Sequence, residues 1–234
     1  MSLKSFNLDS IGNVTVYKRR NNRRINLSVN AHGAVRVSIP TWMPYQTGLN
    51  FVRSKESWII KQQPPKQVFT NAQTIGQDHE LAFASSPHLS KPKATIKDGL
   101  ILVKYPPHQS IIHPDVQAAA LKGALKVLRS QAEMKLLKRL DFIAQQTGLP
   151  YKSLKIKRLS RRWGSCDREK NIVLNLYLVQ LPDELIDYVI CHELTHTKVL
   201  NHGADFWTAL KQISPQAAEL KVRLRHYSPA IIFQ

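Results

Sequence analysis

The chain of 234 residues is 43% hydrophobic and 21% charged, which excludes a disordered chain, and its two cysteines exclude a disulfide framework and favour a reducing compartment. No stretch reaches the roughly 18 apolar residues of a membrane span, and the first ten residues lack the apolar segment of a signal peptide, so we expect a cytoplasmic protein without a membrane partner. The net charge of +18 favours polyanions by long-range attraction, but a surface that only confers solubility is the preferred interpretation of the charge taken alone.

The first part of the chain predicts short strands, because apolar and polar residues alternate between turn residues. The expected strands are 13–18, 24–30, 34–39, 80–84, 93–96 and 100–104. His32 and Gly33 predict a hairpin turn, and Asp98 and Gly99 predict another. The sequence itself contains no evident internal repeat.

One helix interrupts these strands. Helical spacing of apolar residues covers 46–63, and the pair Pro64-Pro65 is expected to end the helix. A second proline pair, Pro106-Pro107, predicts a domain boundary. We therefore divide the chain into a β-rich N-terminal module with one helix, residues 1–112, and a second domain, residues 113–234.

The second domain is predicted to begin with a long helix. It starts at Pro114, which suits a first helical turn, and continues to about residue 146, before Gly148. The remaining expected elements are strands at 154–159 and 172–178, a loop at 161–166, a helix from Pro182 to about Leu200, and a helical region at 204–223 that can break at Pro215.

Residues 192–196 read His-Glu-Leu-Thr-His, and they fall within the expected helix that begins at Pro182. Residues four apart lie on one face of a helix, so His192 and His196 can reach one metal ion. Glu193 lies beside the first ligand, where its carboxylate can accept a proton from a metal-bound water. Three polar side chains on a largely apolar helix are costly to bury without such a partner. The pattern predicts a catalytic zinc site with Glu193 as general base.

A catalytic zinc ion needs a third protein ligand and one open position. The candidates downstream are His202, Asp205, Glu219 and His226. His202 is favoured because Asn201 before it can end the helix in a left-handed conformation and turn the chain back. Glu219, on the next helix, is the main alternative. The spacing between His196 and His202 is that of the metzincins, but their turning glycine would fall at a valine.

Several runs of residues resemble the YgjP-like metallopeptidase domain, a family within the zincin group that is similar to SprT-like proteases. The resemblance covers nearly the whole chain and is carried by residues 162–166 (Arg-Trp-Gly-Ser-Cys), 171–175, 187–196, 201–203 and 206–207. It implies an α+β fold, with a small β-rich module before a zincin-like catalytic domain that contains a metal-binding helix and a mixed sheet. It also implies that His192, His196 and His202 bind Zn²⁺ and that Glu193 is the catalytic base.

Other residues near these motifs have secondary expectations. In a zincin the strand before the metal helix pairs with an extended substrate, and residues 172–178 occupy that place in the sequence. Asp187 and Asp205 are candidate partners for the ligating imidazoles, although each is more often a solvated acid. Cys166 and Cys191 are expected to be structural, and residues 206–207 are expected to pack around the His202 turn.

Two functions from different classes follow. The first is a zinc metallopeptidase that acts on a protein or peptide substrate, with Glu193 activating a zinc-bound water for attack on the peptide bond. The second is a nucleic-acid-binding protein with a structural or vestigial zinc site. Its support is the charge distribution, because Lys and Arg exceed Asp and Glu by ten in residues 1–112 and by nine in residues 113–170, whereas residues 171–234 carry one excess acid.

Overall fold

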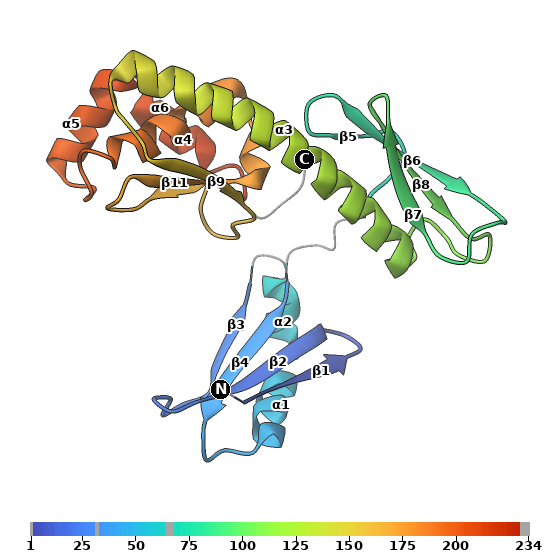
Figure 1. The fold of residues 1–234 in the computed structure, drawn as a ribbon. Coiled ribbons are helices and arrows are strands. Elements are labelled where there is room, and N and C mark those ends of the chain that lie inside the picture. The colour runs from blue at the N-terminus through green and yellow to red at the C-terminus, as the bar shows by residue number, and fades with distance from the viewer. Residues whose placement is uncertain (1, 31–32, 64–67, 230–234) are drawn as a thin grey trace. The chain divides into compact units, whose positions relative to one another are not determined.

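The computed structural model describes residues 2–30, 33–63 and 68–229, and it forms two compact units, Met1–Lys66 and Gln67–Gln234. Each unit has a separate core of buried apolar side chains. The predicted α+β class is confirmed, since helices occur together with sheets that mix parallel and antiparallel pairs (Figure 1). None of the helices within the described ranges is long and apolar enough to cross a membrane.

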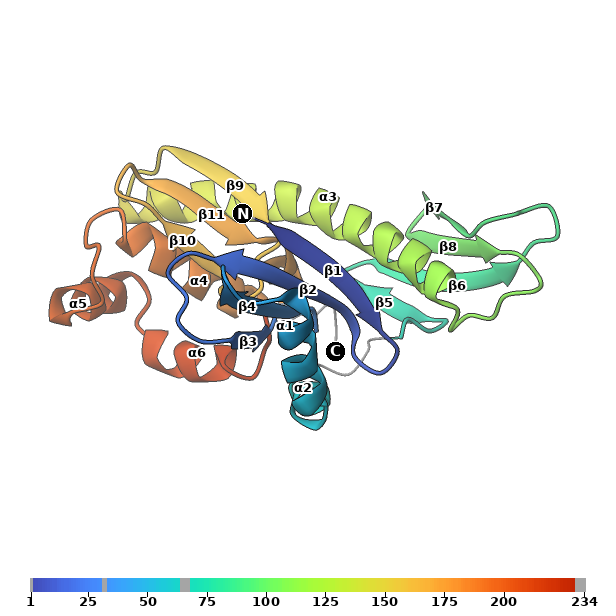
Figure 2. The same ribbon diagram turned by 90° about the horizontal axis from the view of Figure 1, so that it is seen from below.

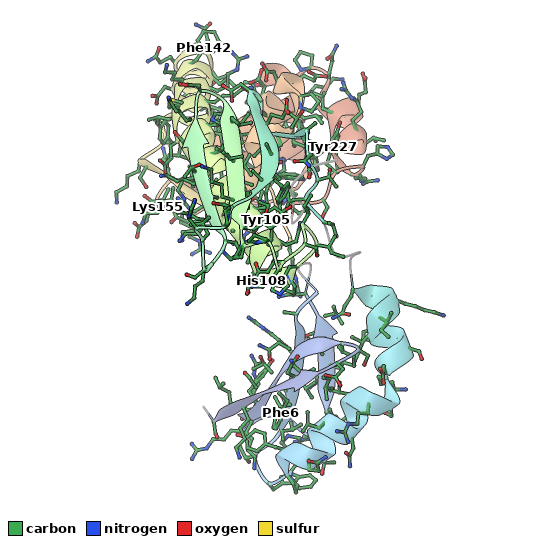
Figure 3. All side chains as sticks on the ribbon, turned by 90° about the vertical axis from the view of Figure 1, so that its right-hand side faces the viewer. Phe6, Tyr105, His108, Phe142, Lys155 and Tyr227 are labelled. Atoms are coloured by element: carbon green, nitrogen blue, oxygen red, sulfur yellow. The ribbon has the colours of Figure 1, made fainter. Side chains whose placement is uncertain are left out.

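The first unit is a four-stranded sheet followed by two helices. Its elements are β1 (Leu3–Leu8), β2 (Gly12–Arg19), β3 (Asn26–Val29), β4 (Val35–Pro40), α1 (Tyr45–Ser54) and α2 (Glu56–Gln62). Alternate strand residues such as Val14, Val16 and Val37 are fully buried, and Phe6 of β1, labelled in Figure 3, packs against them. The single helix predicted over 46–63 is divided at Lys55. The predicted turn at His32 and the helix stop at 64–65 lie outside the described residues.

The second unit begins with a sheet of the same topology. Its strands are β5 (Gln73–Ile75), β6 (His79–Ser85), β7 (Lys93–Lys97) and β8 (Leu100–Tyr105). The order β5-β6-β8-β7 repeats the order β1-β2-β4-β3, and in both sheets the two outer pairs are antiparallel and the central pair is parallel. Asp98 and Gly99 both have positive φ, which confirms the predicted hairpin turn. The chain thus contains a structural repeat that its sequence does not reveal.

Helix α3 (Pro114–Thr147) spans the second unit from one end to the other. Its first half packs on β7 and β8, and its second half packs on α4 and the last sheet (Figures 1 and 2). Both predicted ends are confirmed. His113 caps the first turn by accepting a hydrogen bond from the Asp115 N–H, and Gly148 ends the helix with a φ of 65°.

The remainder of the second unit is a small sheet and three helices. The elements are β9 (Ser153–Lys157), β10 (Gly164–Cys166), β11 (Asn171–Asn175), a 3₁₀ helix η1 (Leu176–Gln180), α4 (Asp183–Thr195), α5 (Ala204–Ile213) and α6 (Ala217–Leu224). The predicted break near Pro215 is confirmed by the gap between α5 and α6. Two sequence predictions are wrong: the strand expected over 172–178 ends at Asn175, and the expected loop at 161–166 contains a strand, β10.

The order β10-β11-β9 also changes which strand is available to a substrate. Strand β11 pairs antiparallel with β10 on one side and parallel with β9 on the other, so neither of its edges is free. The edge strand beside the metal helix is β10, which contacts α4. The prediction that residues 172–178 form the substrate-pairing edge is therefore wrong.

The division between the two units falls at residues 66–67, whereas the sequence placed it at 112–113. The reason is that β5–β8 share one core with α3. Ile75, Leu81 and Ile101 are fully buried in that core. The Gln117 side chain also accepts a hydrogen bond from the Phe69 N–H at 2.7 Å and donates one to the Phe69 carbonyl at 3.0 Å. The proline pair at 106–107 joins parts of one unit.

These contacts predict how fragments of the chain behave. Residues 67–234 alone should fold with the helix content and thermal midpoint of the same unit in the full chain. Residues 113–234 should be unstable, because removing β5–β8 exposes several buried aliphatic side chains of α3, each contributing about 1.5–3 kcal/mol, against a total stability of about 5–15 kcal/mol. Circular dichroism melts of both fragments test this, and a cooperative transition in the shorter fragment would restore the boundary at 112–113.

Candidate metal centre

Helix α4 carries the first part of the site. Its N-terminus follows Pro182 and has Asp183 and Glu184 in the first turn, where acids interact favourably with the helix dipole. Glu184 also pairs with Arg223 of α6 at 2.6 Å. Apolar side chains bury the helix against α3, α5 and α6. The helix is therefore held on several sides, with His192 in its last turn and His196 immediately after its last residue.

The turn after α4 differs from the prediction. The helix ends at Thr195 and not near Leu200, and Asn201 is not among the described residues with positive φ. Instead the chain turns tightly through residues 195–199, where the Val199 N–H donates to the Thr195 carbonyl at 2.9 Å. The Val199 carbonyl lies 3.1 Å from His196 Nδ1. This turn returns the chain so that His202 faces the helix.

Three imidazoles converge at this point. His202 Nε2 lies 3.0 Å from His192 Nε2 and 3.2 Å from His196 Nε2. Two nitrogens that each lie about 2.1 Å from a tetrahedral ion would be about 3.4 Å apart, so the spacing fits one metal ion. Among the residues that the structure describes, His192, His196 and His202 form the group able to hold a metal. The structure thus brings together the three predicted ligands.

Burial favours the neutral form of His192 and His196, which is the form of imidazole that binds a metal ion. Burial lowers the pKa of His192 to about 3, with smaller contributions from His196 and His202, and burial also lowers the pKa of His196. The Val199 carbonyl accepts a hydrogen bond from His196 Nδ1, which leaves Nε2 with a lone pair directed at the other two rings. Neutral imidazoles with converging lone pairs repel one another unless a cation lies between them. A metal ion would satisfy this donor set.

Phe206 packs against all three imidazoles of the site. Its ring centroid lies 4.9 Å from that of His192, 4.5 Å from that of His196 and 4.7 Å from that of His202. Phe206 is fully buried, and the neighbouring Trp207 donates a hydrogen bond from Nε1 to the His202 carbonyl at 3.1 Å. The predicted packing role of residues 206–207 is confirmed, and one side chain restricts all three imidazoles.

Glu193 is buried at the same site as the imidazoles. It is 5% exposed, its Oε2 has no hydrogen-bond partner within the described chain, and burial raises its pKa to about 8 while the Arg162 charge acts in the opposite direction. Gly164 of β10 approaches it so closely that a Cβ atom there would lie 2.6 Å from Glu193 Oε1. A side chain at position 164 would displace the carboxyl group, so the glycine gives Glu193 its space.

A cavity of about 490 Å³ joins these groups. It is lined by the three histidines, Glu193, strand β10 and residues from α4 and α6. The lining also includes polar residues that were not predicted as site residues, among them Tyr188, one helical turn before His192, and Arg162, just before β10. Tyr188 lies four residues before His192, so helical spacing alone could have placed it on the same face of α4 as His192. The position of Arg162 at the cavity depends on tertiary structure.

The other candidate residues lie elsewhere. Glu219 and His226 are exposed and, like Asp205, do not belong to the histidine group. Asp187 forms a two-pronged ion pair with Arg139 of α3, so its carboxylate is used by that contact and not by an imidazole. Cys191 is buried, as expected, and burial raises the pKa of its thiol to about 11.

Comparison with known proteins gives the family. The model of the YgjP-like metallopeptidase domain matches residues 23–227. The chain belongs to this YgjP-like family. It is therefore a metal-dependent protease by family, and the motif runs that suggested the resemblance lie inside the matched range. A search of curated proteins found no match.

Two solved structures are similar to part of the chain. One is the metallopeptidase zymogen abylysin of Pyrococcus abyssi, with a TM-score of 0.36 and 22% identity over 39% of this chain and 92% of that one. The other is the metallopeptidase zymogen jannalysin of Methanocaldococcus jannaschii, with a TM-score of 0.36 and 24% identity over 39% of this chain and 88% of that one.

The geometry predicts which substitutions remove the metal. His202→Ala should lower metal occupancy from one equivalent per chain to well below half, because it removes one of three donors and leaves two neutral imidazoles. Glu219→Ala should leave occupancy unchanged. Elemental analysis of both purified variants beside the unmodified protein is the measurement. Full occupancy in His202→Ala together with loss in Glu219→Ala would assign the third ligand to Glu219.

Proposed function

We propose that the protein is a zinc metallopeptidase with a zincin-like catalytic domain, in which Glu193 is the general base for attack of water on a peptide bond. The observation that carries this proposal is the position of Glu193. Its carboxyl group is buried at the same cavity as three converging imidazoles, and one of its oxygens has no hydrogen-bond partner among the described residues. A site that only held a structural metal would have no use for such a costly group.

The donor set favours zinc among the metals. A set of three histidines is typical of catalytic zinc, which when bound supplies Lewis-acid polarisation of the substrate carbonyl and of water. Glu193 then takes the proton of the attacking water and later returns it to the leaving amine. Gly164 keeps the carboxyl free to do so, and Phe206 holds the imidazoles in place.

Strand β10 is the proposed substrate-binding edge. It pairs with β11 on one side, contacts α4, and contributes Gly164, Ser165 and Cys166 to the cavity wall. An extended peptide can add to the edge of a sheet through backbone hydrogen bonds. Such binding would direct a peptide bond past Glu193, and the backbone hydrogen bonds would contribute affinity for any peptide sequence.

If Glu193 is the general base, replacing it should remove peptide hydrolysis without removing the metal. Glu193→Gln should keep one equivalent of metal but lose peptide hydrolysis by at least 10²-fold, since general acid–base catalysis contributes roughly 10²–10⁴-fold. Metal analysis together with turnover of a casein or fluorogenic peptide substrate measures both. Asp205→Asn, a nearby acid outside the histidine group, is the control. Equal turnover in Glu193→Gln and the unmodified protein would remove Glu193 from the mechanism.

A second candidate function, nucleic-acid binding, is favoured by the charge of the first unit. Residues 1–66 contain eleven Lys and Arg against two acids, an excess of nine. A hollow of about 810 Å³ is lined by Lys18, Arg19, Arg20 and nearby polar residues. Among the described residues of this unit no cation lies in a salt bridge. The two functions are compatible, and a cytoplasmic location stays a prediction from the sequence.

Nucleic-acid binding has a characteristic salt dependence. Binding of labelled duplex DNA should weaken steeply with salt, with log K falling by about 0.9 for each phosphate neutralised per unit of log salt concentration. The double variant Arg19→Gln/Arg20→Gln should reduce that slope, while Arg53→Gln, an exposed cation outside the hollow, should change it less. Fluorescence anisotropy at several salt concentrations measures the slope. No binding even at low salt would leave the charge as a solubility feature.

A further inference from the structure

Arg162 is a cation at the wall of the metal-centre cavity. It lies two residues before Gly164 and lines the same cavity as Glu193 and the three histidines. Its side chain is exposed, and no carboxylate of the described residues lies within salt-bridge distance of it. Arg162 is the residue of the cavity lining whose side chain carries a positive charge at every ordinary pH. An arginine without a partner at the wall of a cleft is available to an anionic ligand.

The backbone of Arg162 is held by a fully buried asparagine. Asn175, at the end of β11, donates from Nδ2 to the carbonyls of Arg162, Leu159 and Pro229 at 3.1, 3.0 and 2.8 Å. Its Oδ1 accepts from the Leu159 N–H, and its own N–H donates to the Trp163 carbonyl at 2.8 Å. Buried polar groups with all their hydrogen bonds made are rigid. The segment that carries Arg162 is therefore fixed relative to β10 and the cavity.

Two further cations come from the opposite element, α6 and its end. Lys221 Nζ lies 4.0 Å from the centre of the Trp207 ring, whose own centre is 6.4 Å from that of His192. Arg225 follows α6, and its charge acts on the hydroxyl of Tyr188, a cavity residue whose pKa is raised chiefly by burial. Neither cation has a salt-bridge partner in the described chain. Arg162 is therefore the cation at the cavity wall, and the charges of Lys221 and Arg225 act on aromatic residues at or near the cavity without lining it.

We propose that Arg162 forms a carboxylate-binding subsite at the cleft, so that the protein selects peptides with an acidic group close to the cleaved bond. Lys221 and Arg225 add to the positive potential at the same cavity without being the direct contact. The ligand is a carboxylate, from a Glu or Asp side chain or from the C-terminus of the peptide. The planar guanidinium can bind such a group with two parallel hydrogen bonds.

This proposal rests on the proposed peptidase function for its substrate, but it can be tested separately by binding. The probe is a set of fluorescent peptides with Glu at one position on either side of the central bond, each matched with a Gln peptide of the same shape. A further pair differs only in a free or an amidated C-terminus. Affinities are measured on the metal-loaded Glu193→Gln protein, and kcat/KM is measured on the metal-loaded protein with Glu193 intact.

The expected result is a preference of about tenfold for the acidic member of a pair at low salt, which weakens as salt is added. Arg162→Gln should reduce the preference to less than about twofold. Arg161→Gln is the matched control, because Arg161 is an exposed neighbour that does not line the cavity. The Glu pairs and the C-terminal pair identify which source of carboxylate the subsite binds.

Different failures have different meanings. Equal affinity for acidic and neutral peptides would overturn the subsite, as would a preference that persists in Arg162→Gln. A loss of kcat/KM by Arg162→Gln that is the same for both members of a pair would also overturn it, because it would assign Arg162 to the reaction and not to selection. If charge-dependent binding is present but no peptide is cleaved, the subsite stands and the peptidase function fails.

Discussion

The constraint on which the site of the second unit depends is the free-energy cost of burying ionisable side chains on and next to the largely apolar helix α4. Glu193 and His196 are buried and His192 is partly buried, with Phe206 packed against all three imidazoles. Such groups lower stability unless each finds a partner. A metal ion would satisfy the three imidazoles together, and the carboxyl group of Glu193 lines the same cavity as they do. The elements packed around α4 restrict the positions of these side chains.

The restriction comes from elements that are distant in sequence. Strand β10 approaches Glu193 through Gly164, while the Asn175 side chain of β11 makes three hydrogen bonds to backbone groups of Leu159 and Arg162 in the preceding segment. On the other side Trp207 holds the His202 carbonyl, and Lys221 covers Trp207. Catalytic groups need to be positioned to within a fraction of an ångström. The rigid surroundings explain how a short helix end and a turn can form such a site.

The two four-stranded sheets have the same topology but pack against different elements. The sheet β1–β4 is followed by the short helices α1 and α2 and forms a unit with its own core, whereas β5–β8 share a core with α3. The first unit has the higher net positive charge per residue, and the second contains the candidate metal centre. The same arrangement of strands therefore serves a separate basic module in one place and supports the catalytic helix bundle in the other.

The sequence by itself determined the features that depend on neighbouring residues. The start of α3 at Pro114 and its end before Gly148, the hairpin at Asp98, and the spacing of His192 and His196 follow from local geometry. Only the tertiary structure decided which strand is the edge, where the units divide, and that Arg162 and Asn175 belong to the site. Those features depend on contacts between distant segments. Alternation or periodicity predicts that a segment is a strand or helix, but not which element it packs against.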